Sequence, residues 1–438
     1  MSKRTAAQVV FVMMLIGLTG GLVARRVAPV ASPPASGEQG DVLGEQPWSP
    51  FPAPATHVVE VGFEYPPDLA DPPTADKNQS KLWYHNTSWW GVLASRESGS
   101  FTIHRLDWST RRWIDTGVPV DDRLTARADV LWDGTYLYIA SAGTAAGESE
   151  QVRLSRYSYS SLTGTHELES GFPVVLSTTG VRGLTVTEHP TGGVWVSYIL
   201  DGRVWIRHSR DDGVTWGEPF SLGEAGDDVV AHTMLPHGPQ MVLISSNRAD
   251  GSVEFASHDA GDPPGSWSQP VHVLESAFVA DDHITAGSLA GPEGSSLFVM
   301  VKTSRDLDPQ SDPNDPQMLL LEKPPVGDWR VHLFGRIQDR HTRPLLVIEE
   351  NRRILHLFAI SPFGSGSLFY KTTSADDIRL EPGRGAPFLD LPDHPEITNP
   401  TSTKQNVNGM SGLVVLASDL ESEHYVTGAL PLHGPDSR

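Results

Sequence analysis

The stretch that decides the fold reads Ser209-Arg210-Asp211-Asp212-Gly213-Val214-Thr215-Trp216. It follows a short β-prone run, Arg203–Ser209. Asp211 carries a short carboxylate that can accept backbone N–H groups across a turn, and Gly213 can adopt a positive φ without steric cost. The last two residues resume an extended, β-prone run. The stretch therefore predicts a hairpin whose turn is held by Asp211 and whose return strand buries Trp216.

The defined positions of this stretch form the pattern Ser-x-Asp-x-Gly-x-Thr-Trp, carried by Ser209, Asp211, Gly213, Thr215 and Trp216. This pattern is the Asp-box, or bacterial neuraminidase repeat, and the chain resembles the sialidase-like β-propellers. In that superfamily the box is a structural turn away from the active site. The resemblance therefore implies a fold and a structural role for these five residues, and it does not imply an activity.

One sequence pattern recurs along the chain: an apolar strand, a turn containing Gly or Asn, and a second apolar strand. It is found in residues 129–141, 184–198 and 344–358. An altered Asp-box begins at Ser257, 48 residues after Ser209, a length that suits one four-stranded blade. Units begin near residues 81, 127, 182, 232, 283, 341 and 406. We predict an all-β fold, a single propeller of seven four-stranded antiparallel blades, with six blades as the alternative.

The last of these units has too few strands to complete its sheet. Residues 57–64 alternate apolar and polar side chains and are the natural strand to complete it, so we place the propeller at residues 57–438. Closing the ring in this way removes open sheet edges.

Two segments precede the propeller. Residues 1–26 combine a basic start, Lys3 and Arg4, with an apolar core at residues 9–18, which indicates a signal peptide or an N-terminal membrane anchor. Residues 27–56 are rich in Pro and Ser and read as a linker. We therefore expect an exported protein, secreted or tethered, whose membrane contact is made through the first segment if that segment is not cleaved.

Composition excludes several classes of function. The 438 residues carry a formal net charge of −21 and no basic stripe, which argues against a nucleic-acid partner. The absence of cysteine excludes disulfides, thiolate metal sites and a cysteine nucleophile. The acidic run at residues 306–315 lacks the Gly and terminal Glu of an EF-hand loop and is interpreted as a solvated loop. We expect neither a metal nor a cofactor.

Polar residues recur where the chain enters each predicted innermost strand, and ring closure would gather them around one central pocket. His283 and His341 are candidates for a general acid or base. The candidates for substrate binding are Lys81, Arg127, Asp129, Arg182, His232, Asp282, Arg340, Arg343, Lys404 and Asn406. Arg343 is the sharpest of them, because a guanidinium fits a carboxylate with two parallel hydrogen bonds.

The family resemblance stops short of sialidase catalysis. Catalytic sialidases are known for an Arg-Ile-Pro motif near the first blade, an arginine triad, a Tyr–Glu nucleophilic pair and an Asp acid/base. No Arg-Ile-Pro occurs here, and the nearest string, Arg336-Ile337-Gln338, lies too late in the chain. Arg127, Arg182 and Arg343 could imitate the triad, but no Tyr–Glu pair can be matched.

Two functions of different classes remain open. The first is a carbohydrate-active propeller, a glycoside hydrolase or polysaccharide lyase, that binds an anionic or polyhydroxylated glycan and moves a proton with a histidine or tyrosine. The second is a non-catalytic extracytoplasmic binding or scaffold propeller. In both, the partner is a glycan or another small anionic or polar ligand.

Overall fold

The computed structural model describes residues 57–432 except residues 68, 70, 77, 144–149 and 363. The predicted export segment at residues 1–26 and the predicted linker at residues 27–56 lie outside the described residues. None of the helices in the described part is both long and apolar enough to cross a membrane.

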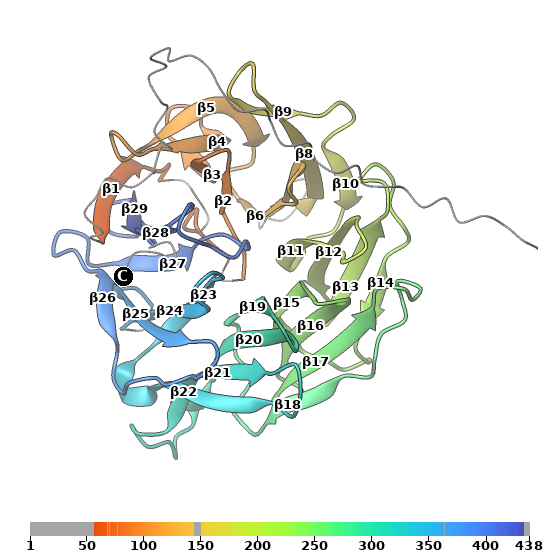
Figure 1. The fold of residues 1–438 in the computed structure, drawn as a ribbon, viewed down its shortest axis with the longest axis vertical. Coiled ribbons are helices and arrows are strands. Elements are labelled where there is room, and N and C mark those ends of the chain that lie inside the picture. The colour runs from red at the N-terminus through yellow and green to blue at the C-terminus, as the bar shows by residue number, and fades with distance from the viewer. Residues whose placement is uncertain are drawn as a thin grey trace, which may run out of the picture. The chain divides into compact units, whose positions relative to one another are not determined.

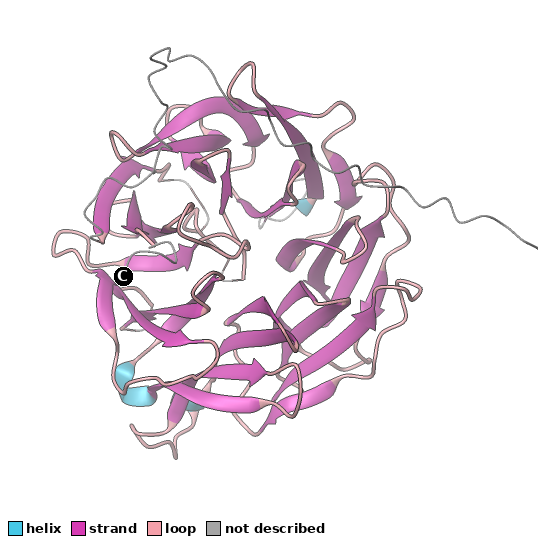
Figure 2. Cartoon of the chain, viewed as in Figure 1, coloured by secondary structure: helices cyan, strands magenta, loops and turns pink. Residues whose placement is uncertain are grey.

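The described chain forms seven antiparallel sheets arranged as blades around a ring (Figure 1). Strands and loops make up nearly all of it (Figure 2). Within the described residues the named helices are two short 3-10 turns, η2 (Arg305–Leu307) and η3 (Ile337–Asp339). The predicted all-β propeller is confirmed, and the count is seven blades.

Blades 1 to 6 each run outward from an innermost strand in chain order. Blade 1 consists of β2 (Leu82–His85), β3 (Ser88–Ser95), β4 (Ser100–Asp107) and β5 (Arg112–Asp121). Blade 2 consists of β6 (Ala126–Trp132), β7 (Tyr136–Gly143), β8 (Val152–Ser160), and both β9 (Thr165–Leu168) and β10 (Val174–Ser177) on β8. Blade 3 consists of β11 (Arg182–Glu188), β12 (Val194–Leu200), β13 (Arg203–Ser209) and β14 (Phe220–Leu222).

The next three blades repeat this order. Blade 4 consists of β15 (Val229–His237), β16 (Gln240–Asn247), β17 (Ser252–Asp259) and β18 (Val271–Glu275). Blade 5 consists of β19 (Ile284–Gly291), β20 (Gly294–Lys302), β21 (Pro316–Lys323) and β22 (Arg330–Arg336). Blade 6 consists of β23 (Thr342–Glu349), β24 (Ile354–Ser361), β25 (Ser367–Ser374) and β26 (Ala386–Leu389).

Blade 7 closes the ring with strands from both ends of the described chain. From the channel outward it contains β27 (Ile397–Thr401), β28 (Leu413–Asp419), β29 (His424–Leu430) and β1 (Val58–Glu64). Val58 pairs with Ala429, and Val61 pairs with Val426. The prediction that residues 57–64 complete the last sheet is confirmed.

The predicted start of the seventh unit near residue 406 is wrong. Its innermost strand is β27, and the apolar run after residue 411 is the second strand, β28. The sequence hides β27 because it reads Ile-Thr-Asn-Pro-Thr, with a proline and an asparagine inside the strand. Residues 402–412 therefore form a loop between two strands of one blade.

The Asp-box forms a closed turn between β13 and β14. The Asp211 carboxylate accepts the Thr215 backbone N–H at 2.8 Å and the Thr215 hydroxyl at 2.6 Å. The Ser209 hydroxyl accepts the Gly213 N–H at 2.8 Å, and the Trp216 indole N–H donates to the Gly213 carbonyl at 2.9 Å. These hydrogen bonds lower the pKa of the exposed Asp211 carboxyl to about 2. Trp216 lies half-buried in the turn, ahead of the return strand rather than within it.

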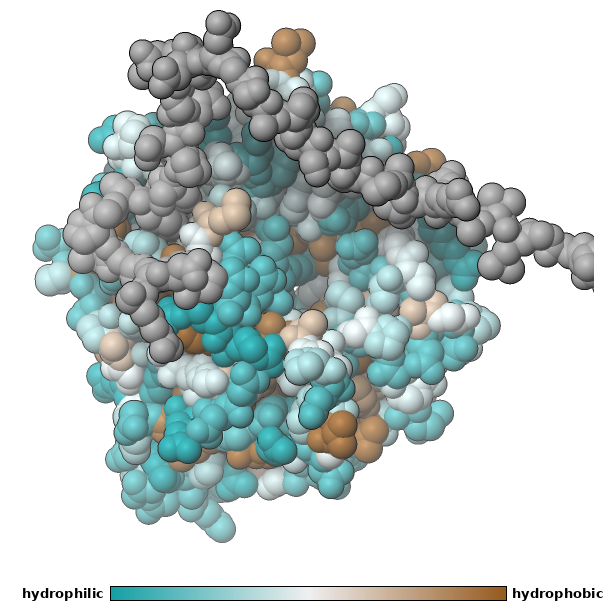
Figure 3. Space-filling model, viewed as in Figure 1, coloured by the Kyte–Doolittle hydropathy of each residue, from teal (hydrophilic) through white to brown (hydrophobic). Residues whose placement is uncertain are grey.

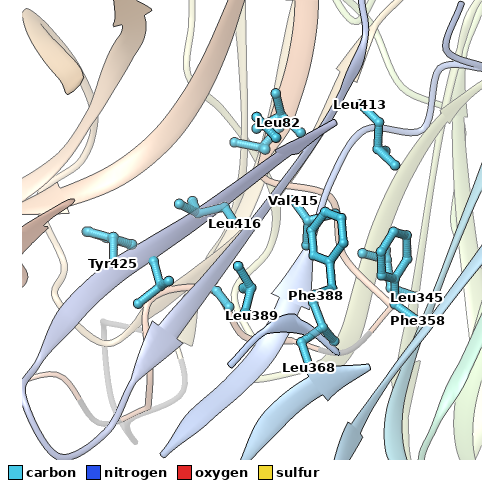
Figure 4. Close-up of a cluster of buried hydrophobic side chains, with 14 of the residues drawn as sticks. Leu82, Leu345, Phe358, Leu368, Phe388, Leu389, Leu413, Val415, Leu416 and Tyr425 are labelled. Atoms are coloured by element: carbon cyan, nitrogen blue, oxygen red, sulfur yellow. The ribbon is translucent and has the colours of Figure 1, made fainter. Parts of the chain in front are cut away.

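Apolar side chains fill the spaces between neighbouring blades. One cluster joins blades 1, 6 and 7 and includes Leu82, Phe358, Phe388, Leu416 and Tyr425, all almost inaccessible to solvent (Figure 4). Full burial of a large apolar side chain stabilises a fold by about 1.5–3 kcal/mol. Repeated around the ring, this packing gives a rigid frame on which loops at either end of the channel are positioned.

Substitutions in the Asp-box test the hairpin. We expect Trp216→Ala to lower the free energy of unfolding by about 2–3 kcal/mol, because a half-buried indole loses its packing and its hydrogen bond. Asp211→Ala should also lower the melting temperature. Since the folded pKa of Asp211 lies below its unfolded value, its contribution is complete above about pH 4 and disappears as the pH falls through about 2. Urea unfolding between pH 7 and pH 2 measures both effects. Wild-type stability of Trp216→Ala would contradict the packing role.

Candidate functional site

The residues that precede the innermost strands lie at one end of the central channel, here called the mouth. Each blade has four strands along its main path, so the chain returns to the same end before it begins the next blade. Figure 3 shows one face of the propeller, on which hydrophilic and hydrophobic residues both border the centre of the ring.

A segment between β1 and β2 crosses the mouth. We call residues 71–80 the strap; residue 77 lies outside the described residues. The strap is bonded to several blades: Thr74 Oγ1 lies 2.8 Å from Ser418 Oγ of blade 7, and Asn78 Nδ2 donates to the His232 carbonyl of blade 4 at 2.8 Å. Gln79 Nε2 donates to the Leu184 carbonyl of blade 3 at 2.9 Å. The strap therefore partly fills the channel from the mouth.

Two arginines from distant blades face the strap carboxylate of Asp76. Arg127 of blade 2 donates to Asp71, and its Nη1 lies 3.2 Å from Asp76 Oδ2. Burial alone would lower the pKa of Arg127, but Asp76 and Asp71 outweigh it and raise the pKa. Burial lowers the pKa of Arg343 of blade 6, against the charges of Asp282 and Asp76. The charge of Asp76 therefore acts on the pKa of both Arg127 and Arg343.

Arg182 is the exposed arginine of the mouth. It begins β11 and, with Arg127 and Asp71, lines a cavity of about 610 Å³ between blades 2 and 3. Within the described residues its guanidinium has no hydrogen bond or ion pair, so it is available to a ligand at this end of the channel.

His283 lies at the mouth with its ring held on both sides. Its Nδ1 donates to Asp281 and lies 2.7 Å from Asp282 Oδ1, while Nε2 lies 3.1 Å from Thr342 Oγ1. Lys302 Nζ binds the other oxygen of Asp281 at 2.7 Å. With the ring proton on Nδ1, Nε2 accepts a hydrogen bond from the Thr342 hydroxyl. Asp282 remains 44% exposed beside this ring.

The prediction that His341 points into the channel is wrong. Its ring is fully buried between blades 5 and 6, 5.0 Å from the Phe334 ring, and its Nε2 bonds to the Arg384 carbonyl at 3.1 Å. A Cβ on Gly335 would lie 2.1 Å from His341 Nδ1, so that glycine provides the space for the ring. Burial lowers the pKa of His341 to about 4. The arrangement is that of a packing residue.

Lys404 and Asn406 belong to the loop after β27 and reach into the channel away from the mouth, contrary to the prediction that they lead into an innermost strand. Lys404 Nζ pairs with the fully buried Asp129 and donates to the Val186 carbonyl at 2.6 Å. Asn406 Nδ2 donates to the Ser288 carbonyl at 3.2 Å. Together with the strap, this loop lines an inner cavity of about 290 Å³.

Three of the remaining candidates, Lys81, His232 and Asp129, are buried, whereas Arg340 is exposed. Lys81 is buried and donates to Gln79 Oε1 at 2.7 Å, and burial lowers its pKa to about 7. His232 is buried with Nε2 2.9 Å from Ser197 Oγ, and burial lowers its pKa to about 3. Asp129 accepts the Ser80 and Val186 backbone N–H groups and is part of the channel wall. Arg340 is exposed at the end of η3 in a left-handed conformation, φ 57°.

Sequence reasoning missed the carboxylates that balance these cations. Asp71 and Asp76 lie in a Pro-rich stretch that resembles a connector, and only ring closure brings them to Arg127. Asn399, which accepts from Arg343 Nε at 2.9 Å, lies in the strand that the pattern did not reveal. Asp281 lies one residue before Asp282 and two residues before His283, and this short spacing is the feature of the sequence that could have identified it as a site residue. The mouth therefore combines arginines, carboxylates and one histidine.

Comparison with known proteins gives structural neighbours only. No family model and no curated protein matches the sequence. The fold is similar to polysaccharide lyase Uly1, with a TM-score of 0.49 and 9% identity over 85% of this chain and 92% of that chain. It is also similar to the GH93 alpha-L-arabinofuranosidase of Fusarium graminearum with arabinobiose, with a TM-score of 0.43 and 14% identity over 70% and 92% of the two chains.

A third neighbour is the alpha-L-arabinanase of Penicillium chrysogenum complexed with arabinobiose, with a TM-score of 0.42 and 12% identity over 70% and 92% of the two chains. These names describe carbohydrate-active enzymes. At such identities and TM-scores the likeness carries no argument about activity, and the seven-bladed fold rests on the strand pairings of this chain.

Removing Asp129 tests how firmly the channel is held. We expect Asp129→Ala to destabilise the fold by about 3–5 kcal/mol, because it leaves the Ser80 and Val186 backbone N–H groups without their acceptor and Lys404 without its ion-pair partner. Asp71→Ala is the matched control: it also removes one carboxylate from an arginine or lysine pair, but at a partly exposed position where about 1 kcal/mol or less is expected. Thermal and urea unfolding give both values. If the two variants lose the same free energy of unfolding, Asp129 stabilises the fold no more than the partly exposed Asp71 does.

Proposed function

We propose that the protein is an exported, sialidase-like β-propeller that binds an anionic or polyhydroxylated glycan at the mouth of its channel. One observation carries this proposal: blades 2, 3 and 6 bring Arg127, Arg182 and Arg343 to the same end of the channel. Export is supported by residues 1–26, and the sialidase-like assignment by the Asp-box hairpin.

The three arginines differ in what they can offer a ligand. Arg127 is already paired with two strap carboxylates, so it fixes the strap. Arg343 donates Nε to Asn399, which leaves other N–H groups of its guanidinium for a ligand. Arg182 is exposed and lines the outer cavity. A ligand carboxylate or sulfate is thus expected to contact Arg182 first and Arg343 second.

The mixture of charges at the mouth suits a sugar better than a simple anion. Vicinal sugar hydroxyls both donate and accept hydrogen bonds, and the mouth offers donors on Arg182 and Arg343 together with acceptors on Asp71 and Asp282. Asp71 and Asp282 are both partly exposed, at 38% and 44% of their side-chain surface. A purely cationic site would favour phosphate or sulfate ions, whereas this site offers carboxylate acceptors as well as guanidinium donors.

A second candidate function, cleavage of the bound glycan, is favoured by the arrangement around His283. Asp281 holds its Nδ1 and is itself held by Lys302, which fixes the tautomer and the ring orientation of a general base. Asp282, beside the ring, supplies a second group able to exchange a proton. If His283 does not transfer protons, the protein is a non-catalytic binding propeller.

Arginine substitutions test binding. On an array of neutral and acidic glycans we expect Arg182→Ala and Arg343→Ala each to weaken retention of the best ligand about tenfold or more, because a charge-assisted hydrogen bond is lost. Arg210→Ala is the matched control, since Arg210 is an exposed arginine of the same blade as Arg182 but lies in the Asp-box turn, at the far end of the strands. Unchanged retention in both mouth variants would refute the proposed site.

Histidine substitution tests cleavage. With a glycan that wild-type protein converts to product, His283→Asn should reduce kcat about 10²–10⁴-fold and leave KM nearly unchanged, because proton transfer is lost while the arginines still bind. His332→Ala, on the outer strand β22, serves as the control. If wild-type protein retains glycans and releases no product from any of them, the protein is a binding module and the cleavage role of His283 is rejected.

A further inference from the structure

A cluster of potential metal ligands lies on the outer half of blade 4, on strands other than those that lead to the mouth. It consists of Asp250 in the loop before β17, Glu254 on β17 and His272 on β18. Glu254 and His272 are directly paired across the two strands. One ligand atom from each of the three residues lies within 4.8 Å of the others. Because two adjacent strands and their loop fix the three side chains, the cluster is set by the sheet register.

The separations in this cluster match ligands around one metal ion. His272 Nε2 lies 3.4 Å from Asp250 Oδ2 and 3.7 Å from Glu254 Oε1. Both distances exceed those of good N–H···O hydrogen bonds. Ligands at about 2.0–2.2 Å from a tetrahedral zinc ion are separated from one another by about 3.3–3.6 Å. The two separations from Nε2 are close to this range, and the two carboxylate oxygens lie within 4.8 Å of each other.

Surrounding residues orient each ligand. Glu275 Oε2 lies 3.2 Å from His272 Nδ1, which places the ring proton on Nδ1 and leaves the lone pair of Nε2 directed to the two carboxylates. The Ser252 hydroxyl donates to Asp250 Oδ1 at 2.6 Å, so the oxygen that faces His272 is the other one, Oδ2. A carboxylate–histidine pair behind the ligand atom is the arrangement that metal-binding histidines usually have.

The local charge also favours a cation. Three carboxylates gather on one side of the blade: Asn247 Nδ2 lies 3.2 Å from Asp227 Oδ1 and 3.3 Å from Glu254 Oε1, and a carboxylate oxygen of Asp250 lies within 4.8 Å of one of Glu254. Within the described residues, the ion pairs of Asp250 and Glu254 are made with His272 alone. A divalent ion would neutralise carboxylates that a single imidazole cannot balance.

A cavity of about 540 Å³ adjoins the cluster and leaves room for further ligands. It lies between blades 3 and 4 and is lined by the three ligands, Asp227 and Trp267. Water or a substrate group could occupy the remaining coordination position from this side, as at open zinc sites.

From this geometry we infer that Asp250, Glu254 and His272 form a zinc site with an open coordination position in the groove between blades 3 and 4. The set of one imidazole and two carboxylates selects a borderline ion such as zinc over calcium or magnesium, which prefer oxygen ligands alone. The second His–carboxylate group, at Asp281, Asp282 and His283, is less suited because Lys302 already occupies Asp281.

The test is titration of the chelator-treated, untagged full chain with ZnCl2, followed by isothermal calorimetry and by the visible spectrum after CoCl2 addition. We expect one zinc ion bound in wild-type protein, at least tenfold weaker binding in His272→Ala and Glu254→Gln, and loss of the tetrahedral cobalt absorption in both. Glu275→Gln should weaken binding about 10–100-fold through misorientation of His272.

His332→Ala is the matched control, because His332 forms a two-residue pair with Glu322 at 2.9 Å on blade 5 and has no third ligand there. Its zinc affinity should equal that of wild type. Circular dichroism confirms that each variant is folded, which is expected since His272 lies at a partly exposed position. The inference is overturned if His272→Ala binds zinc as tightly as wild type, or if CaCl2 at equal concentration displaces the zinc. Neither result depends on glycan binding at the mouth.

Discussion

The arrangement of the channel depends on one buried carboxylate, that of Asp129. It has no solvent exposure, and it accepts the backbone N–H of Ser80 from the strap and that of Val186 from blade 3, while Lys404 reaches it from the loop of blade 7. Four parts of the chain that are distant in sequence therefore meet on two oxygens. An ion pair on a buried carboxylate adds little net stability. It instead favours the one chain arrangement in which Lys404 meets Asp129, because Asp129 is costly to bury without a partner.

The position of the strap follows from this anchor, and the character of the mouth follows from the strap. Ser80 ends the strap at Asp129, so the strap must cross the mouth, and its carboxylates come to lie among the arginines. The result is a local set of alternating charges in a protein of net charge −21. Beyond about 8 Å in physiological salt the overall negative charge is screened, so a ligand at the mouth responds mainly to the nearby guanidinium and carboxylate groups.

Much of the fold could be predicted because its signals are local. The Asp-box hydrogen bonds connect residues at most a few positions apart. Six of the innermost strands can be recognised in the sequence as apolar runs that follow polar residues. The seventh could not be found in this way, since Asn399 and Pro400 interrupt its pattern and its partner strand looks more like a first strand than β27 does. This single error displaced Lys404 and Asn406 from the channel interior to the mouth.

The candidate site was less predictable because side-chain direction and long-range contacts decide it. His341 and Arg343 are two residues apart at the start of one strand, yet His341 turns toward Gly335 between two blades while Arg343, at φ 51°, turns toward Asn399. A left-handed residue at a strand start breaks the alternation on which such reasoning rests. The zinc ligands illustrate the same limit: Asp250, Glu254 and His272 have no motif spacing, and only the register of β17 and β18 brings them together.

The closing pair of strands has a consequence for how the protein is made. β1 is synthesised before every other strand, and its partner β29 is synthesised last, with Val58 facing Ala429. The first six blades use consecutive strands, whereas the seventh can form only after β29 has been synthesised. Contacts between residues so distant in sequence form slowly. Until β1 and β29 pair, the sheet edges that they will join expose unpaired backbone N–H and C=O groups. The nascent chain is therefore most vulnerable to aggregation in the interval before β29 becomes available to pair with β1.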